Sequence, residues 1–170
     1  APSSHMAHYA LAQALFFRKE IQAFRNAADR TLALNPMDGN ATSHLGMLVA
    51  CAGEWERGCA LAERATRLNP HHPGWYWYPM FFDAYRRGDY HGALAIVLKI
   101  NLPGHVYGCA VRAAAHAQLG EMEPAREALR ELLVLRPEFA VSVHDDFGRW
   151  FDPELTAHLI DGLRKAGLGG

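Results

Sequence analysis

The chain has 170 residues, of which half are hydrophobic and 21% are charged, and its formal net charge is −1. These values are typical of a globular protein with a buried core, and they exclude the strongly basic surface by which proteins bind nucleic acids or anionic membranes. No apolar run approaches the ~18 residues of a membrane span, and three widely spaced cysteines (Cys51, Cys59 and Cys109) predict buried free thiols in a reducing compartment.

The first six residues show no signal peptide, because they lack both a charged start and an apolar stretch. The tripeptide Ser4-His5-Met6 looks like a cloning remnant, and we interpret residues 1–6 in that way. This interpretation fits an excised domain, which we expect to be cytoplasmic.

Residues 39–72 are predicted to form one structural repeat. Pro36 and Pro70 stand 34 positions apart, and Leu45-Gly46 lies near the start of the stretch. A Leu-Gly pair followed by Pro at this distance is the pattern of the tetratricopeptide (TPR) repeat, a pair of antiparallel helices. We expect Gly46 to let the two helices pack closely, Gly53 to end the first helix, and Pro70 to stop the second.

The same period extends along the chain, so that residues 7–137 are predicted to form four TPR-like repeats. The first repeat runs from about 5 to 38, the third from about 74 to 105, and the fourth from about 106 to 137. Pro79 falls inside the first helix of the third repeat and removes a backbone donor there. We therefore expect a kink or a late start in that helix.

The period is lost after Pro137, and residues 138–170 are predicted to form an irregular segment followed by a capping helix. Residues 139–151 fit no repeat position, which favours irregular structure. Asp152-Pro153 then begins a helix, with Asp as the N-cap and Pro in the first turn, and Gly167 ends it. The predicted fold is all-α, a right-handed TPR superhelix of about four helix pairs plus a C-terminal capping helix.

Several stretches of sequence between residues 35 and 168 resemble a known group of proteins. They include Asn69-Pro-His-His-Pro-Gly-Trp-Tyr-Trp-Tyr78, Tyr85-Arg-Arg-Gly-Asp-Tyr90 and Ile100-Asn-Leu-Pro-Gly-His105. The group is the C-terminal TPR region of bacterial class III adenylate/guanylate cyclases and of related winged-helix regulators. The resemblance implies a bacterial, cytoplasmic module that regulates a neighbouring domain or binds a partner. It implies no cyclase activity for this part of the chain.

Aromatic and small residues of the third and fourth repeats form a candidate groove. In the third repeat four aromatic residues recur at i, i+3, i+7 and i+10, the positions that face the concave side of a TPR superhelix. The equivalent positions of the fourth repeat hold Tyr107 and alanines. An alanine floor beside an aromatic wall leaves room for a helix or an extended peptide, and Arg86 at the rim suits an acidic partner. The alternative occupant is the chain's own tail, with Phe147, Trp150 and Phe151. The candidate partner-binding residues are Trp75, Tyr78, Phe82, Tyr85, Arg86, Tyr107, Ala110 and Ala114.

The sequence predicts no catalytic, cofactor-binding or metal-binding residue. It contains no GxSxG motif, no phosphate-binding glycine loop and no HExxH or HxxxH pair, and His71-His72 lies in a turn between two prolines. We interpret these histidines as structural. An enzyme would have to use Asp145 and Asp146, with His144, as its acid–base groups.

From these observations we interpret the chain as a non-catalytic protein–protein interaction and regulatory module. We expect a scaffold that needs no cofactor and binds neither nucleic acid nor membrane. Its partner is expected to be a protein or peptide, either an adjacent domain of a longer chain in cis or a second copy in a homodimer. The alternative function is a sensor domain that binds a small apolar ligand in the aromatic groove.

Overall fold

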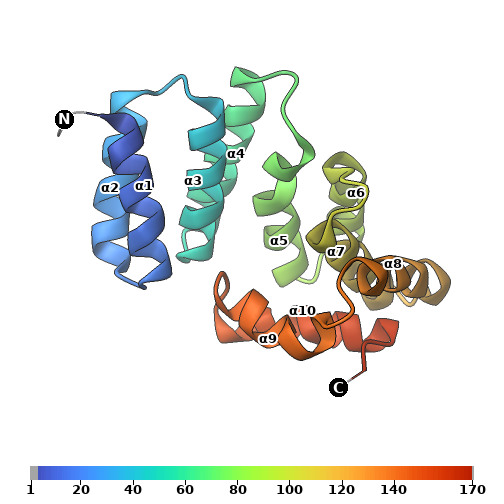
Figure 1. Cartoon of the computed structure of the whole chain (residues 1–170). Coiled ribbons are helices and arrows are strands. Elements are labelled where there is room, and N and C mark those ends of the chain that lie inside the picture. Colours follow the sequence, from blue (N-terminus) through green and yellow to red (C-terminus); the bar gives the residue numbers. More distant parts are fainter. Residues whose placement is uncertain (1–3, 170) are drawn as a thin grey trace. The chain divides into compact units, whose positions relative to one another are not determined.

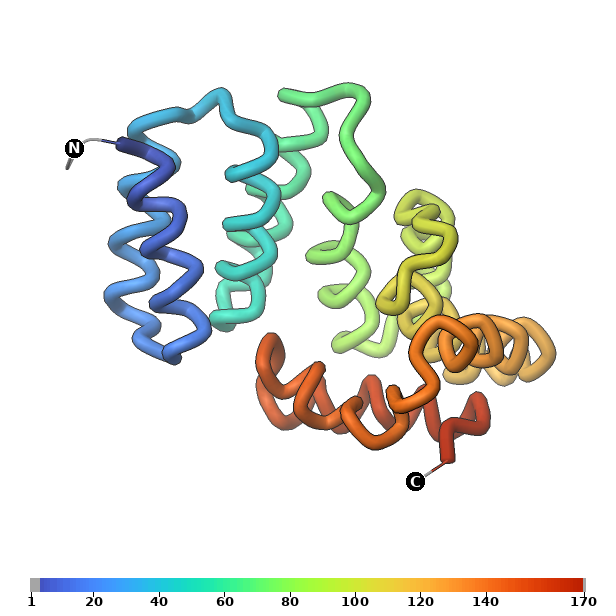
Figure 2. The backbone as a smooth tube through the Cα atoms, viewed as in Figure 1, coloured from blue at the N-terminus to red at the C-terminus, as the bar shows by residue number. Residues whose placement is uncertain are grey.

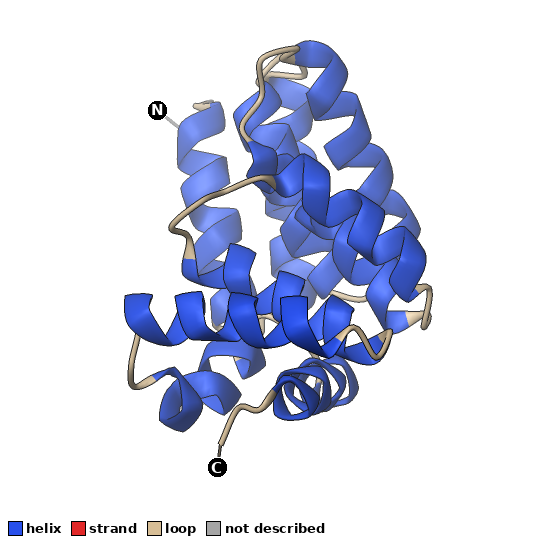
Figure 3. Cartoon of the chain, turned by 90° about the vertical axis from the view of Figure 1, so that its right-hand side faces the viewer, coloured by secondary structure: helices blue, strands red, loops and turns tan. Residues whose placement is uncertain are grey.

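The computed structural model describes residues 4–169, and within that range the chain is helical and contains no strand (Figure 1; Figure 3). The helices divide into two compact units, residues 1–79 and 80–170. Of the stretch interpreted as a cloning remnant, residues 1–3 lie outside the described range. His5 and Met6 lie in the first helix, and His5 hydrogen-bonds to the carboxylate of Asp38 at 3.3 Å.

The first unit consists of two helix pairs and a short 3-10 helix. Its elements are α1 (His5–Phe17), α2 (Ile21–Leu34), α3 (Gly39–Cys51), α4 (Trp55–Leu68) and η1 (Gly74–Trp77). Figure 2 shows the chain reversing direction after α1 and again after α3, so that each pair is antiparallel. Within the unit α1 packs on α2 and α3 on α4, and the second pair also packs on the first.

The helices of the second pair approach most closely at two glycines. A Cβ atom on Gly46 would lie 2.8 Å from the carbonyl oxygen of Gly58, and a Cβ atom on Gly58 would come still closer to the carbonyl oxygen of Gly46. The matching positions of the first pair, one repeat period earlier, are Ala12 and Phe24, and both are fully buried. The predicted role of Gly46 as the point of close helix packing is confirmed.

The turn inside each pair contains a residue with left-handed backbone geometry. Gly53 has φ +95° and follows α3, as expected for a glycine that ends this helix. In the first pair the equivalent position, one repeat period earlier, is Lys19, with φ +61°. This left-handed conformation destabilises a residue that has a side chain by about 1–2 kcal/mol relative to glycine.

The second unit contains the remaining helices. They are α5 (Tyr78–Arg86), whose first residues belong to the first unit, α6 (Tyr90–Ile100), α7 (Val106–Gln118), α8 (Met122–Leu135), α9 (Phe139–Gly148) and α10 (Pro153–Ala166). The late start predicted from Pro79 is confirmed, because the 3-10 helix η1 precedes Tyr78 and the α-helix begins only there.

The prediction of irregular structure for residues 139–151 was wrong over most of that segment, because residues 139–148 form α9. Phe139, Val143 and Phe147 are spaced four residues apart and are all buried, so they form one helical face. The 34-residue repeat ends before this segment, but a helical period of apolar residues continues through it.

The capping helix was predicted correctly as α10. The side chain of Asp152 accepts a hydrogen bond from the backbone nitrogen of Leu155 at 2.8 Å, which is the geometry of an N-cap. Gly167 ends the helix with φ +112°. Leu155, Leu159 and Leu163 are all buried, and α10 packs on α7, α8 and α9.

Candidate functional site

The eight candidate partner-binding residues are divided between the two units. Trp75 and Tyr78 belong to the first unit, and the remaining six belong to the second. In the second unit Phe82, Tyr85 and the two alanines are buried, while Tyr107 is half-buried and Arg86 is exposed. Four of the six second-unit residues are therefore already covered within the chain.

The cover over Phe82 and Tyr107 comes from the segment around α9. The ring centroid of Phe82 lies 4.5 Å from that of Phe151, and the ring of Tyr107 lies 6.4 Å from that of Phe147. Trp150, the third aromatic residue expected to fill the groove, is half-buried. The sequence left two alternatives for the groove, a partner or the chain's own tail. The structure shows the tail in contact with Phe82 and Tyr107.

Helix α10 covers the alanine floor, and a glycine permits the contact. A Cβ atom on Gly162 would lie 3.1 Å from the Cβ atom of Ala114 and would overlap the hydroxyl oxygen of Tyr85. Both Ala110 and Ala114 are about 1% exposed. The floor of small side chains accepts a helix, as expected from the sequence, but that helix belongs to the same chain.

Hydrogen bonds fasten α10 to the second unit around Tyr85. The Tyr85 hydroxyl donates to the backbone carbonyl of His158 at 3.2 Å and accepts from the amide nitrogen of Gln118 at 3.2 Å. The same Gln118 amide group donates to Asp161 at 3.1 Å and accepts from Lys165 at 2.8 Å. These bonds join α5, α7 and α10, and they give the covering helix a defined position.

Burial also shifts the proton affinities of two side chains at this contact. Burial raises the pKa of Tyr85 well above its ordinary value, so the phenol stays protonated and able to donate. Burial lowers the pKa of His158, which favours the neutral imidazole. The neutral ring forms a hydrogen bond of 2.8 Å with the hydroxyl of Tyr90.

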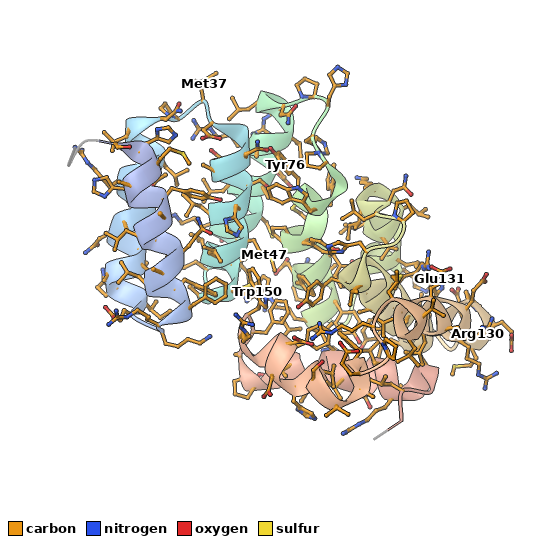
Figure 4. All side chains as sticks on the ribbon, viewed as in Figure 1. Met37, Met47, Tyr76, Arg130, Glu131 and Trp150 are labelled. Carbon is orange, nitrogen blue, oxygen red and sulfur yellow. The ribbon has the colours of Figure 1, made fainter. Side chains whose placement is uncertain are left out.

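The first-unit residues Trp75 and Tyr78 are half-buried and lie next to a residue that the sequence analysis did not single out. Tyr76, which Figure 4 labels, is fully buried in η1. Its hydroxyl donates to the side-chain oxygen of Asn40 at 2.5 Å. The ring centroids of Trp75 and His72 lie 4.5 Å and 5.1 Å from that of Tyr76. The period-based interpretation missed Tyr76 because η1 does not follow α-helical spacing.

The carboxylates named for an enzyme alternative have structural surroundings. Asp146 accepts hydrogen bonds from Arg136 at 3.2 Å and from Ser142 at 2.8 Å, while Asp145 and His144 are exposed at neighbouring helical positions. These bonds tie Arg136, the C-cap residue of α8, and Ser142, in the middle of α9, to the last turn of α9. His144, Asp145 and Asp146 occupy consecutive helical positions, which point to different sides of α9.

A pocket of about 160 Å³ lies elsewhere in the second unit, between α6, α7 and α8. Its lining includes Leu98, Cys109, Arg112 and Glu131, and none of the eight candidate residues. The Cys109 thiol donates to Glu131 at 3.6 Å, and burial raises the pKa of the thiol, as expected for an unreactive thiol. Arg112 pairs with the same carboxylate.

Residues 4–169 contain neither a candidate metal site nor a membrane-spanning helix. No three His, Cys, Asp or Glu side chains in this range come together in a way that could hold a metal ion. None of the helices in the same range is both long enough and apolar enough to cross a membrane.

Comparison with known proteins gives the class of fold. No protein-family model matches the chain, and a search of curated proteins gave no match. Among solved structures, residues 41 to the end of MamA from Desulfovibrio magneticus RS-1 align with a TM-score of 0.66 at 16% identity, covering 95% of this chain and 88% of that one. PilW, a type IV pilus biogenesis factor, aligns with a TM-score of 0.73 at 11% identity, covering 98% and 74%. YrrB, a TPR protein with an unusual peptide-binding site, aligns with a TM-score of 0.62 at 15% identity, covering 98% and 86%.

The chain therefore has the fold of a TPR α-solenoid, as the 34-residue period predicted. At these identities the likeness concerns the fold.

Proposed function

We propose that the chain is a regulatory protein-interaction module whose second unit recognises an amphipathic helix on the surface formed by α5 and α7. The observation that supports this proposal is the contact between that surface and α10, in which Gly162 lies on Ala114 and His158 meets Tyr85. This surface combines small and aromatic residues with a rim of hydrogen-bonding groups, and it holds a helix in cis. A partner helix with the same features would compete for it.

The strength of the cis contact limits which partners can compete. Leu155, Leu159 and Leu163 are all buried, and burying a leucine contributes about 1.5–3 kcal/mol, so the stripe alone contributes roughly 5–9 kcal/mol before ordering costs. A partner that binds with a Kd of 1 µM supplies about 8 kcal/mol. Only a helix with a comparable apolar stripe can therefore displace α10 to a useful extent.

The same geometry favours a protein partner over a small apolar ligand. The aromatic line of the second unit is filled by Phe151 and α10, and the separate pocket of about 160 Å³ is smaller than the roughly 300–1,000 Å³ of ordinary ligand sites. We further propose, from the sequence resemblance, that the partner is an adjacent domain of a longer bacterial chain or a second protein in the cytoplasm.

A labelled peptide of residues 152–168 tests the proposal in trans against the full chain. Gly162→Leu should loosen α10, because the added side chain meets Tyr85 and Ala114, and the variant should then bind the peptide, as seen by fluorescence anisotropy. Gly148→Leu is the matched control, since a Cβ atom there has no neighbour within 4 Å. The wild type and the control should bind little peptide, because their own α10 occupies the surface.

Two results would refute the proposal. One is a folded Gly162→Leu variant with a lowered melting temperature that binds no peptide up to about 100 µM, which is roughly 5 kcal/mol of affinity. The other is equal peptide binding by the wild type and Gly162→Leu, which would place the peptide on a different surface.

A further inference from the structure

One side of α1 carries a stripe of exposed apolar residues. Ala7, Leu11 and Ala14 follow one another at helical spacing and are all exposed, Leu11 by 48%. Phe17 adds a further exposed aromatic ring at the end of the helix. We call these four residues the α1 stripe. No Asp, Glu, Lys or Arg occurs in α1, so no charge interrupts it.

The repeat period identifies what normally covers such a stripe. The positions one repeat period later lie on α3, and Ala41, Leu45 and Leu48 are all buried there. Each of these two helices packs on the second helix of its own pair, but α3 also packs on the preceding pair, α1 and α2. A preceding helix pair therefore covers this face of α3. Within the part of the chain that the structure describes, no helix pair precedes α1.

An ion pair between the two repeats indicates the charge that the covering helix carries. Arg25 of α2 donates to Glu54, the N-cap residue of α4, at 2.5 Å. The matching position in the first pair is Glu20, the N-cap residue of α2. Its side chain is 44% exposed and pairs with the exposed Arg18 at 2.7 Å. An exposed pair of this kind contributes little, so it exchanges readily for an incoming arginine.

We propose that the α1 stripe and Glu20 bind an amphipathic α-helix that presents an apolar face and an arginine, in the way that α2 packs on the second pair. The stripe runs for about 15 Å from Ala7 to Phe17, which matches three turns of a partner helix. The stripe lies on a helix, whose backbone groups are already hydrogen-bonded within the helix. An extended peptide therefore finds no strand edge to pair with. The proposal concerns the first unit and does not depend on the function proposed for the second.

The probe is a peptide of residues 20–36 of this chain, which contains the α2 sequence and Arg25. A helix of this length is marginal alone, so Gln22→Lys and Asn26→Asp, both on its exposed side, are joined as a lactam. Binding to the full chain is measured by isothermal titration calorimetry. Leu11→Lys is the test variant, and Leu98→Lys, at a leucine of α6 that is even more exposed than Leu11, is the control.

We expect saturable binding that Leu11→Lys weakens by at least about tenfold and that Leu98→Lys changes by less than about twofold. Glu20→Arg should weaken binding of the same peptide several-fold, and a peptide with Arg25→Glu should recover the loss. This exchange of charges separates a specific contact from general stickiness of the stripe.

Three results would overturn the proposal. Absence of binding at about 1 mM peptide, an affinity below roughly 4 kcal/mol, would show that the stripe does not bind such a helix. Equal losses in Leu11→Lys and Leu98→Lys would place the peptide elsewhere. Dimerisation of the chain alone that Leu11→Lys abolishes, seen by sedimentation equilibrium, would assign the stripe to a second copy.

Discussion

Replacing Gly58 with alanine should destabilise the first unit by up to about 2 kcal/mol, although alanine is the better helix former. The new Cβ atom would lie 2.6 Å from the backbone nitrogen of Ala50 and closer still to the carbonyl oxygen of Gly46. Both neighbours are backbone atoms of α3, so the clash can be relieved only by moving a helix. Overpacking of this kind costs roughly 1–3 kcal/mol, and the higher helix propensity of alanine offsets about 1 kcal/mol of it.

The control for this prediction is Gly148→Ala on α9. A Cβ atom there has no neighbour within 4 Å, so only the propensity gain of about 1 kcal/mol remains and the variant should be slightly more stable. Urea unfolding followed by circular dichroism at one temperature measures both variants. A loss of about 2 kcal/mol corresponds to a lower melting temperature by roughly 4–8 °C for a chain of this size. Stabilisation of both variants would show that α3 and α4 are not in close contact at Gly58.

Four further predictions concern other parts of the structure. Lys19→Gly should stabilise the chain by about 1 kcal/mol, because glycine adopts φ +61° without strain, and an unchanged urea midpoint would contradict that backbone geometry. Phe82→Ala and Phe151→Ala should show a coupling of about 0.5–1.5 kcal/mol in a double-mutant cycle, and additive losses would mean that the rings are not in contact. Asp152→Ala should cost about 1 kcal/mol through the lost N-cap bond, measured by the same urea titration, whereas Asp152→Asn should cost much less. Burial lowers the pKa of His158 in the folded state, so its contribution to stability is present above the unfolded pKa of about 6.5 and is lost as the pH falls below it. Stability should therefore decrease between pH 7 and pH 5, and the decrease should be smaller in His158→Gln; equal slopes would refute this role.

The sequence alone predicted the parts of the fold that depend on local patterns. The period between Pro36 and Pro70 located the helix pairs, and Asp152 and Gly167 marked both ends of α10. These signals act through capping, turn geometry and helix termination, which involve residues close together in the chain. The repeat period did not predict α9, because this helix follows the end of the repeats and only its own apolar spacing indicates it.

The candidate site was harder to predict because its environment depends on distant residues. The aromatic spacing of α5 correctly indicated a second apolar face, but the spacing does not say what covers it. The contact that decides the question, between Tyr85 and the backbone of His158, joins residues 73 positions apart. Likewise, the exposure of Leu11 and the burial of Leu45 follow from their neighbours, since the two residues occupy the same position of the repeat.

The covering of the second unit by α10 has a consequence during synthesis. A ribosome makes α5, α6 and α7 well before α10, so Phe82, Tyr85 and Ala114 emerge without the helix that buries them. Contacts so far apart in sequence form late, and apolar surface exposed in the meantime favours aggregation or chaperone binding. Nascent chains arrested before residue 152 should therefore be retained by chaperones, whereas chains that extend past Leu168 should be released.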